Sequence, residues 1–130
     1  MNKLRVLVAD DNGDMREVLV AVLKRAFEVV ATVDDGQALI DSALASHPDV
    51  IVSDISMPKW TGPQAKHELM ARGRDIPFVF VSAGENIIGE LAPFVPKSQV
   101  FGKLVPAVHA AAAIKAQYSP RIQLAANGGR

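Results

Sequence analysis

The chain has 130 residues, and its 14 basic and 14 acidic residues give a formal net charge of zero. This length suits one domain with a single core, and a hydrophobic content of 49% favours a buried sheet. The absence of cysteine excludes disulfides and thiolate metal sites. No apolar stretch approaches the roughly 20 residues of a membrane span, and the first residues lack a signal-peptide pattern, so we expect a cytoplasmic protein without membrane contact.

Apolar runs alternate with helical patterns along the chain, which is typical of a doubly wound α/β domain. The first part of the chain predicts a strand at 4–9, then a helix from about Asp14 that is capped by Asn12 or Gly13. The elements predicted next, in chain order, are a strand at 28–33, a helix at 37–45, a strand at 50–54, a helix from about 63 to 71 and a strand at 78–81.

The pattern is weaker in the remaining part of the chain. Residues 86–91 allow only a turn or two of helix before a short fifth strand at 93–96. A last helix is expected to begin near Gly102, because Pro106 is tolerated in a first turn and damaging deeper in a helix. We expect one domain at 1–118 and a flexible tail at 119–130.

The distribution of charge is uneven. All acidic residues lie within positions 1–90, and residues 91–130 carry only basic ones. We interpret this last segment as a solvated, mildly basic helix, with an acidic partner as the alternative. Basic and aromatic residues are not interleaved as in a nucleic-acid patch, so no direct DNA binding is expected.

Four charged residues follow predicted strands. Asp10 and Asp11 follow the first strand, Asp54 ends the third, and Lys97 follows the fifth. Ligands of open parallel sheets bind beyond the carboxyl ends of the strands, so these groups are expected to converge. Two carboxylates 4 Å apart repel by roughly 4 kcal/mol at an effective dielectric of about 20. A hard cation such as Mg²⁺ and a nearby ammonium would offset that repulsion.

Together these residues resemble the receiver domain of CheY-like response regulators. The resemblance runs from about Leu4 to Ala113. It implies a flavodoxin-like, five-stranded parallel sheet with helices on both faces. The segments that carry the resemblance are Val8-Ala9-Asp10-Asp11, Asp54-Ile55-Ser56-Met57-Pro58 with Gly62, Ser82-Ala83, and Lys97.

The resemblance also implies roles for these residues. Asp54 would accept a phosphoryl group from a sensor histidine kinase or a histidine phosphotransfer protein, and Lys97 would contact a phosphoryl oxygen. Mg²⁺ would be held by the carboxylates of Asp11 and Asp54 and the backbone carbonyl of Ser56, with Asp10 acting mainly through a coordinated water. The blander alternatives are a helix cap for Asp10 and Asp11, a turn residue for Asp54, and an exposed side chain for Lys97.

Ser82 is the expected switch residue. The resemblance implies that its hydroxyl and the backbone N–H of Ala83 would contact the phosphoryl group. Phe94 matches an aromatic residue of the family that turns inward in response. Phe94 as a plain core residue is an equally weighted alternative. The switch would change contacts with a downstream protein that the sequence does not name.

Two features depart from the family pattern. Ser98 follows Lys97 where the family usually has proline after a cis bond, so a trans bond is expected here. The stretch from Ser82 to Lys97 is several residues shorter than in the family, so the family's fourth helix is expected to be shortened or missing. We therefore expect a monomer or a weak dimer. Small residues at Ser56 and Gly84 predict a short-lived phosphoryl group.

The sequence thus predicts a phosphoacceptor receiver of a two-component phosphorelay. The alternative is an atypical receiver that acts as a docking module without phosphorylation. An enzyme is not expected, because no residues remain for an output domain. Haloacid-dehalogenase-type phosphatases place a second aspartate where this chain has Ser56, and no P-loop or G-x-G-x-x-G run is present.

Overall fold

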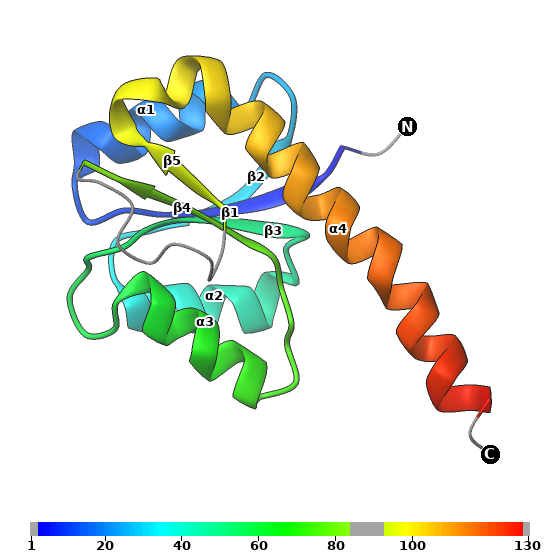
Figure 1. The fold of residues 1–130 in the computed structure, drawn as a ribbon. Helices are drawn as coiled ribbons and strands as arrows, with labels where there is room; N and C mark the ends of the chain where they lie inside the picture. Colours follow the sequence, from blue (N-terminus) through cyan, green and yellow to red (C-terminus); the bar gives the residue numbers. More distant parts are fainter. Residues whose placement is uncertain (1–2, 84–92, 129–130) are drawn as a thin grey trace.

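The computed structural model describes residues 3–83 and 93–128, with side chains described up to residue 114. Within these residues, strands and helices alternate along the chain (Figure 1). The elements are β1 (Arg5–Ala9), α1 (Gly13–Leu23), β2 (Glu28–Val33), α2 (Gly36–Ser46), β3 (Val50–Asp54), α3 (Gly62–Ala71), β4 (Phe78–Ser82), β5 (Phe94–Pro96), the 3₁₀ turn η2 (Lys97–Gln99) and α4 (Val100–Gly128).

The five strands form one parallel sheet in the order β2-β1-β3-β4-β5. Helices α1 and α4 cover one face, and α2 and α3 cover the other (Figure 1). An all-parallel sheet needs this cover because both of its faces are apolar. The predicted doubly wound, flavodoxin-like fold is confirmed. The central strand β3 pairs with β1 on one side and β4 on the other, so their carboxyl ends lie side by side.

The core is divided between the two faces by the alternation of side chains along each strand. In β1, Val6 and Val8 pack with the α1 and α4 residues, whereas Leu7 and Ala9 pack with those of α2 and α3. The same alternation holds in β3 and β4. The near-continuous apolar runs that predicted these strands are therefore a consequence of burial on both sides.

Side-chain caps fix the starts of three helices. Asn12 caps α1, as one of the two predicted candidates, by accepting from the backbone N–H of Met15. Asp35 caps α2, and Thr61 forms a capping box with Gln64 at the start of α3. These caps pair orphan backbone donors of the first turn. The starts of these three helices are therefore fixed by residues at the ends of the loops that precede them.

The last helix begins earlier than predicted. It starts at Val100, directly after η2 and two residues before Gly102. Val100, Leu104 and Val108 are spaced at helical intervals and are at most 1% exposed. Burial of this stripe against the sheet outweighs the hydrogen bond that Pro106 cannot donate in the second turn.

The C-terminal part of α4 includes the segment that was expected to form a tail. A flexible tail was expected from Ser119, but the backbone is helical to Gly128 and extends away from the sheet (Figure 1). That expectation relied on Pro120, Asn127 and the Gly128-Gly129 pair. A single proline removes one hydrogen bond, and a helix can continue across it with a bend. The division into a domain at 1–118 and a tail stays a prediction.

One further prediction concerns residues that the structure does not describe. The short helical segment expected at 86–91 lies outside them, and only residues 83–93 connect β4 to β5. Among the described residues, no helix combines the length and hydrophobicity required to cross a bilayer.

Candidate functional site

Three aspartates meet at the carboxyl edge of the sheet. Asp10 and Asp11 follow β1, and Asp54 ends the neighbouring strand β3. Each offers one carboxylate oxygen, and these oxygens all lie within 4.8 Å of one another. Asp10 is fully buried and Asp54 is 8% exposed, whereas Asp11 is exposed. The structure therefore brings together the carboxylates that the sequence predicted to converge, and we call these three residues the acidic cluster.

Asp10 is fixed by contacts with three different segments. Its backbone N–H donates to the carbonyl of Val33 in β2 at 3.1 Å, and its Oδ1 accepts from the backbone N–H of Asn12 at 2.9 Å. The guanidinium of Arg16 donates to the Asp10 carbonyl at 2.6 Å. The turn between β1 and α1 is thus held rigid at the residue that is buried deepest in the cluster.

Arg16 is a contributor that sequence reasoning missed. It lies in the first turn of α1, where the helix dipole disfavours a cation. A basic residue at such a position is a signal that it has a specific partner nearby. That partner is the Asp10 carbonyl, which no sequence pattern identifies as an acceptor for a side chain.

Asp54 is positioned by close backbone packing. The hydroxyl of Ser53 donates to the Asp54 carbonyl at 2.7 Å, and the N–H of Gly62 donates to the Ile55 carbonyl at 2.8 Å. A side chain at position 62 would collide with the Asp54 carbonyl and would lie 2.8 Å from the Phe80 ring. Glycine is therefore required where the loop after β3 returns to α3.

Lys97 supplies the cation of the site. It directly follows β5, and its Nζ lies 3.1 Å from Oδ2 of Asp10 and 3.3 Å from Oδ2 of Asp54. The alternative of an ordinary exposed lysine is excluded, since the side chain is only 20% exposed. The described residues contain no cis peptide bond, so the Lys97–Ser98 bond is trans as predicted. The replacement of the family's proline by Ser98 does not prevent the lysine from reaching the carboxylates.

The pKa values reflect this crowding. Burial, followed by the negative charge of Asp10, raises the pKa of Asp54 above its ordinary value, and Lys97 only partly offsets this rise. Partial burial acts to lower the pKa of Lys97, but its interactions with Asp10 and Asp54 outweigh that effect and raise the pKa. Lys97 is therefore protonated at neutral pH, and one ammonium does not fully compensate the carboxylates.

The acidic cluster fits a hard divalent cation. Its ligand atoms are all carboxylate oxygens, which Mg²⁺ prefers. Oδ2 of Asp10 is buried and has no hydrogen-bond partner of good geometry among the described residues, although it pairs electrostatically with Lys97. A second positive charge near this oxygen would satisfy it and relieve the repulsion with Asp54.

The predicted switch residues lie on the neighbouring strands. Ser82 ends β4 one residue beyond Val81, which pairs with Asp54 in the register of the sheet. Ala83 is exposed, and Phe94 is a partly exposed residue of β5 that pairs with Phe80. Ser56 is exposed in the loop after Asp54. The roles proposed for these four residues stay predictions.

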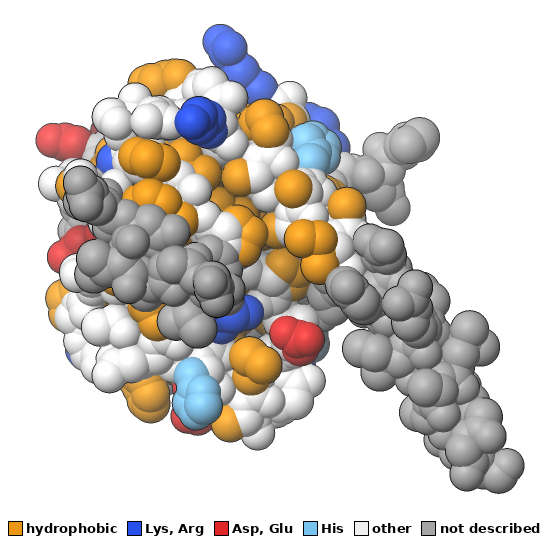
Figure 2. Space-filling model, in the orientation of Figure 1, with side chains coloured by type: hydrophobic (Ala, Val, Ile, Leu, Met, Phe, Trp, Pro, Cys, Tyr) orange, Lys and Arg blue, Asp and Glu red, His pale blue; other side chains and the backbone are white. Residues whose placement is uncertain are grey.

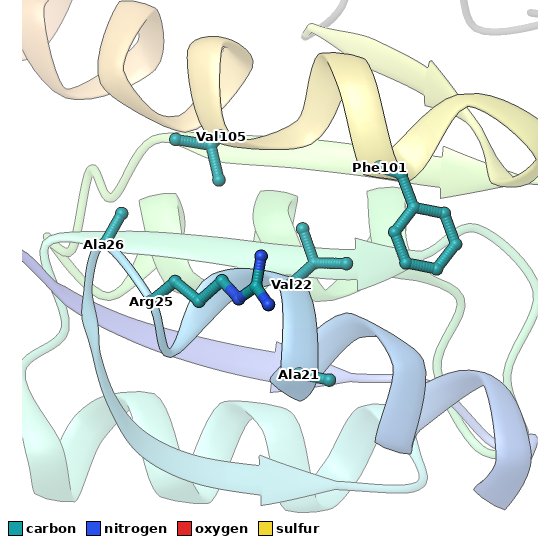
Figure 3. A pocket seen from close by; sticks show the side chains of 6 residues that line it. All are labelled: Ala21, Val22, Arg25, Ala26, Phe101 and Val105. Carbon is teal, nitrogen blue, oxygen red and sulfur yellow. The ribbon is translucent and has the colours of Figure 1, made fainter.

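A shallow groove on a different part of the molecule holds none of these residues. It lies between α1 and α4, where Phe101 and Val105 of α4 face Val22 of α1 and Arg25, which follows that helix (Figure 3). Phe101 is 80% exposed, and hydrophobic side chains gather in the upper half of Figure 2, around the start of α4. The chemistry of the site therefore lies at the sheet edge and not in this groove.

Comparisons with known proteins agree with the fold. Residues 6–92 match the family described as the response regulator receiver domain. The solved receiver domain of the response regulator NarL from Mycobacterium tuberculosis superposes with a TM-score of 0.81 at 28% identity, covering 87% of this chain and 98% of that one. The chain belongs to the response regulator receiver domain family.

Two curated relatives show how such domains are used. The chain is 31% identical over 130 residues to the transcriptional regulatory protein DegU of Brevibacillus brevis, which covers 98% of this chain and 52% of DegU. It is 47% identical over 72 residues to a protein-glutamate methylesterase/protein-glutamine glutaminase of Geobacter metallireducens, which covers 54% of this chain and 20% of that protein. The matched regions thus span about half and about a fifth of these relatives.

The prediction that the protein is not an enzyme is wrong. It relied on the absence of residues for an output domain, yet several relatives are named as methylesterases and glutaminases, which are enzymes. Only a receiver-sized part of each is matched, so their activity is a property of those proteins. The relatives also include a transcriptional regulator, so the expected absence of direct DNA binding stays a prediction.

Proposed function

We propose that this receiver accepts a phosphoryl group on Asp54 from the phosphohistidine of a sensor histidine kinase or a histidine phosphotransfer protein. The observation that supports this function best is the acidic cluster with Lys97 at 3.1 and 3.3 Å from two of its carboxylates. The transfer would switch contacts with a downstream protein. A cytoplasmic location stays a prediction.

The chemistry requires little beyond positioning. A carboxylate oxygen of Asp54 attacks the phosphorus atom, the phosphorus–nitrogen bond of the phosphohistidine breaks, and its electron pair returns to the imidazole, which takes up a proton. Asp54 needs no general base because a carboxylate is ionised at neutral pH. Ser53 and Gly62 would hold the backbone of Asp54 in place during the attack.

The main obstacle is that a carboxylate must approach an anionic phosphoryl group. Lys97 would contact one phosphoryl oxygen and lower this repulsion as a point charge. Asp11 and Asp54, with the Ser56 carbonyl, would hold Mg²⁺ directly, and Asp10 would hold it through a water. The ion supplies screening of the phosphoryl charge when bound. The hydrogen bond from Arg16 to the Asp10 carbonyl would hold the β1–α1 turn, and with it Asp11, in position for the ion.

The product creates the signal. A phosphoryl group adds about −1.5 to −2 charges and three strong acceptor oxygens. Ser82 ends β4, the strand beside Asp54, and Ala83 follows it. The Ser82 hydroxyl and the Ala83 backbone N–H would move toward these oxygens, and Phe94 would turn inward in response. The change shifts a pre-existing equilibrium by the difference in binding between the two states. A short phosphoryl lifetime stays a prediction, and Gly84 lies outside the described residues.

Intact-mass analysis tests the proposal. After incubation with acetyl phosphate and Mg²⁺, we expect the wild type to gain the mass of one phosphoryl group and Asp54→Asn to gain none. Asp34→Asn is the matched control, because Asp34 is an exposed aspartate outside the acidic cluster. No gain in the wild type, with intact folding by circular dichroism, would favour the alternative of a phosphorylation-independent docking module. A gain retained in Asp54→Asn would contradict the assignment of this residue.

The short connection after β4 predicts the oligomeric state. Family members commonly pair through a face made by their fourth helix, fifth strand and last helix, and here only residues 83–93 lie between β4 and β5. We therefore expect light scattering to give a monomer or a weak dimer both without and with a phosphoryl mimic and Mg²⁺. A complete shift from monomer to dimer on adding the mimic would contradict this expectation.

A further inference from the structure

The loop between β3 and α3 contacts the start of another helix. This loop, residues 55–61, follows Asp54 and contains Ser56, the predicted backbone ligand of the metal ion. It is closed at its base by the hydrogen bond from Gly62 N–H to the Ile55 carbonyl at 2.8 Å. Its middle part belongs to no helix or strand and contains one backbone hydrogen bond, from Trp60 N–H to the Pro58 carbonyl at 2.8 Å, while Lys59 adopts a left-handed conformation with φ of 71°. The position of the loop therefore depends on what it packs against.

The packing partner is the first turn of α2. The backbone N–H of Gly36 donates to the Pro58 carbonyl at 3.1 Å. The indole Nε1 of Trp60 donates to Oε1 of Gln37, also at 3.1 Å. A side chain at position 36 would collide with the backbone of Trp60, so glycine allows this close approach. Two loop residues are thus hydrogen-bonded to two consecutive residues of α2.

These contacts are unequal in strength. The ion pair between Lys59 and Asp35 is 3.5 Å long and Lys59 is 64% exposed, so it contributes little. The Trp60 and Gln37 side chains are partly buried, and Trp60 also packs against the apolar core under α2 and α3. The Gln37–Trp60 hydrogen bond is consequently the stronger side-chain contact between the loop and the first turn of α2, and it involves no residue of the acidic cluster. Met57 of the loop is 8% exposed and packs against the same core, so the hydrogen bond adds to this burial.

We infer that Gln37 is a positioning residue that sets the affinity of the acidic cluster for its divalent cation by anchoring the loop through Trp60. The inference rests on the proposed function. Gln37 would not touch the ion: it holds the loop backbone through Trp60, and that loop carries the Ser56 carbonyl, the proposed ligand two positions after Asp54. Loss of the anchor would let this carbonyl sample other positions. Binding of the ion would then have to order the loop, which lowers the binding free energy.

Calorimetric titration of the metal-free protein with Mg²⁺ tests the inference. We expect Gln37→Ala and Trp60→Phe each to weaken binding about fivefold, the scale of one hydrogen bond. The double variant should weaken it no further than either single change, because both remove the same contact. Gln37→Glu keeps an acceptor oxygen for the Trp60 indole N–H and should retain wild-type affinity.

Asp41→Ala is the matched control. It removes the other hydrogen bond of Gln37, from Nε2 to Oδ1 of Asp41 at 3.1 Å, and leaves the loop contact intact. This variant should bind Mg²⁺ like the wild type. A weakening in Asp41→Ala equal to that in Gln37→Ala would mean that general damage to α2 is responsible, and it would overturn the inference.

The titration also separates this inference from the proposed function. If the wild type binds Mg²⁺ and Asp54→Asn abolishes binding, but Gln37→Ala binds equally well, only the role of Gln37 is refuted. Failure of the wild type itself to bind Mg²⁺ would refute both. Urea unfolding of the metal-free variants checks stability, and a loss of stability in Gln37→Ala with unchanged affinity also refutes the positioning role.

Discussion

Replacing Lys97 with methionine is expected to destabilise the metal-free protein and to suppress phosphorylation of Asp54. Lys97 is the cation within ion-pair distance of Asp10, which is fully buried, and Asp54, which is 8% exposed. Removing one partner of a buried pair typically costs 3–5 kcal/mol. Because Lys97 keeps 20% exposure, we expect a loss of about 2–3 kcal/mol in the free energy of unfolding.

The loss should depend on pH in a defined direction. Burial and Asp10 already raise the pKa of Asp54, so the folded protein holds this proton more tightly than the unfolded chain. Ionisation of Asp54 therefore lowers stability as the pH rises above the ordinary carboxyl value of about 4. Without Lys97 this effect grows, so the difference from the wild type should be largest at neutral pH and shrink toward pH 4.

Urea unfolding in chelator at several pH values measures the loss of unfolding free energy and its dependence on pH. The same series is then repeated with Mg²⁺. Mg²⁺ should restore part of the stability, since an ion that binds only the folded state stabilises it. Lys103→Met is the matched control, because Lys103 is an exposed lysine of α4, the helix that directly follows the turn of Lys97. Equal losses in the two variants, or a loss that does not change with pH, would contradict the ion-pair account.

Gly62→Ala is expected to have the second large effect. The new methyl group would collide with the Asp54 carbonyl and approach the Phe80 ring at 2.8 Å and Oγ of Ser53 at 2.9 Å. The Asp54 carbonyl and the Ser53 hydroxyl are themselves hydrogen-bonded, so neither can yield without cost. Overpacking of this kind costs about 1–3 kcal/mol of unfolding free energy. Displacement of Asp54 should also slow its phosphorylation.

Gly102→Ala is the matched control for this substitution. A methyl group at position 102 would meet nothing within 4 Å, and the residue lies inside α4. Alanine in a helix is more stable than glycine by about 0.5–1 kcal/mol, so this variant should gain stability. Urea unfolding of both variants gives the comparison. A Gly62→Ala protein as stable as the wild type would show that the loop after β3 can move aside.

The sequence predicted those parts of the fold that depend on local patterns. The apolar runs gave all five strands, and each observed end lies within one residue of its predicted position. The acidic cluster followed from one geometric rule, because Asp10, Asp11 and Asp54 each lie at the end of a strand in a parallel sheet. Lys97 lies at the end of β5 and reaches the same place although its local sequence departs from the family pattern.

The missed features depend on contacts between distant segments. Nothing near Gln37 in the sequence shows that Trp60 will lie beside it, 23 positions later. The start of α4 at Val100 depends on how its apolar stripe fits the sheet, which outweighed the local penalty at Pro106. Arg16 left only a weak signal, a cation placed against the helix dipole. Tertiary packing decided these cases, and single-sequence propensity does not encode it.

The anchored loop has a practical consequence for spectroscopy. Trp60 is the only tryptophan of the chain, and it lies six positions after Asp54 in the same loop that leads away from the acidic cluster. Indole fluorescence responds to the polarity and hydrogen bonding around the ring. The unlabelled protein therefore contains an intrinsic optical probe in the loop that follows its predicted phosphorylation site, and we expect emission intensity to report changes of that loop in real time.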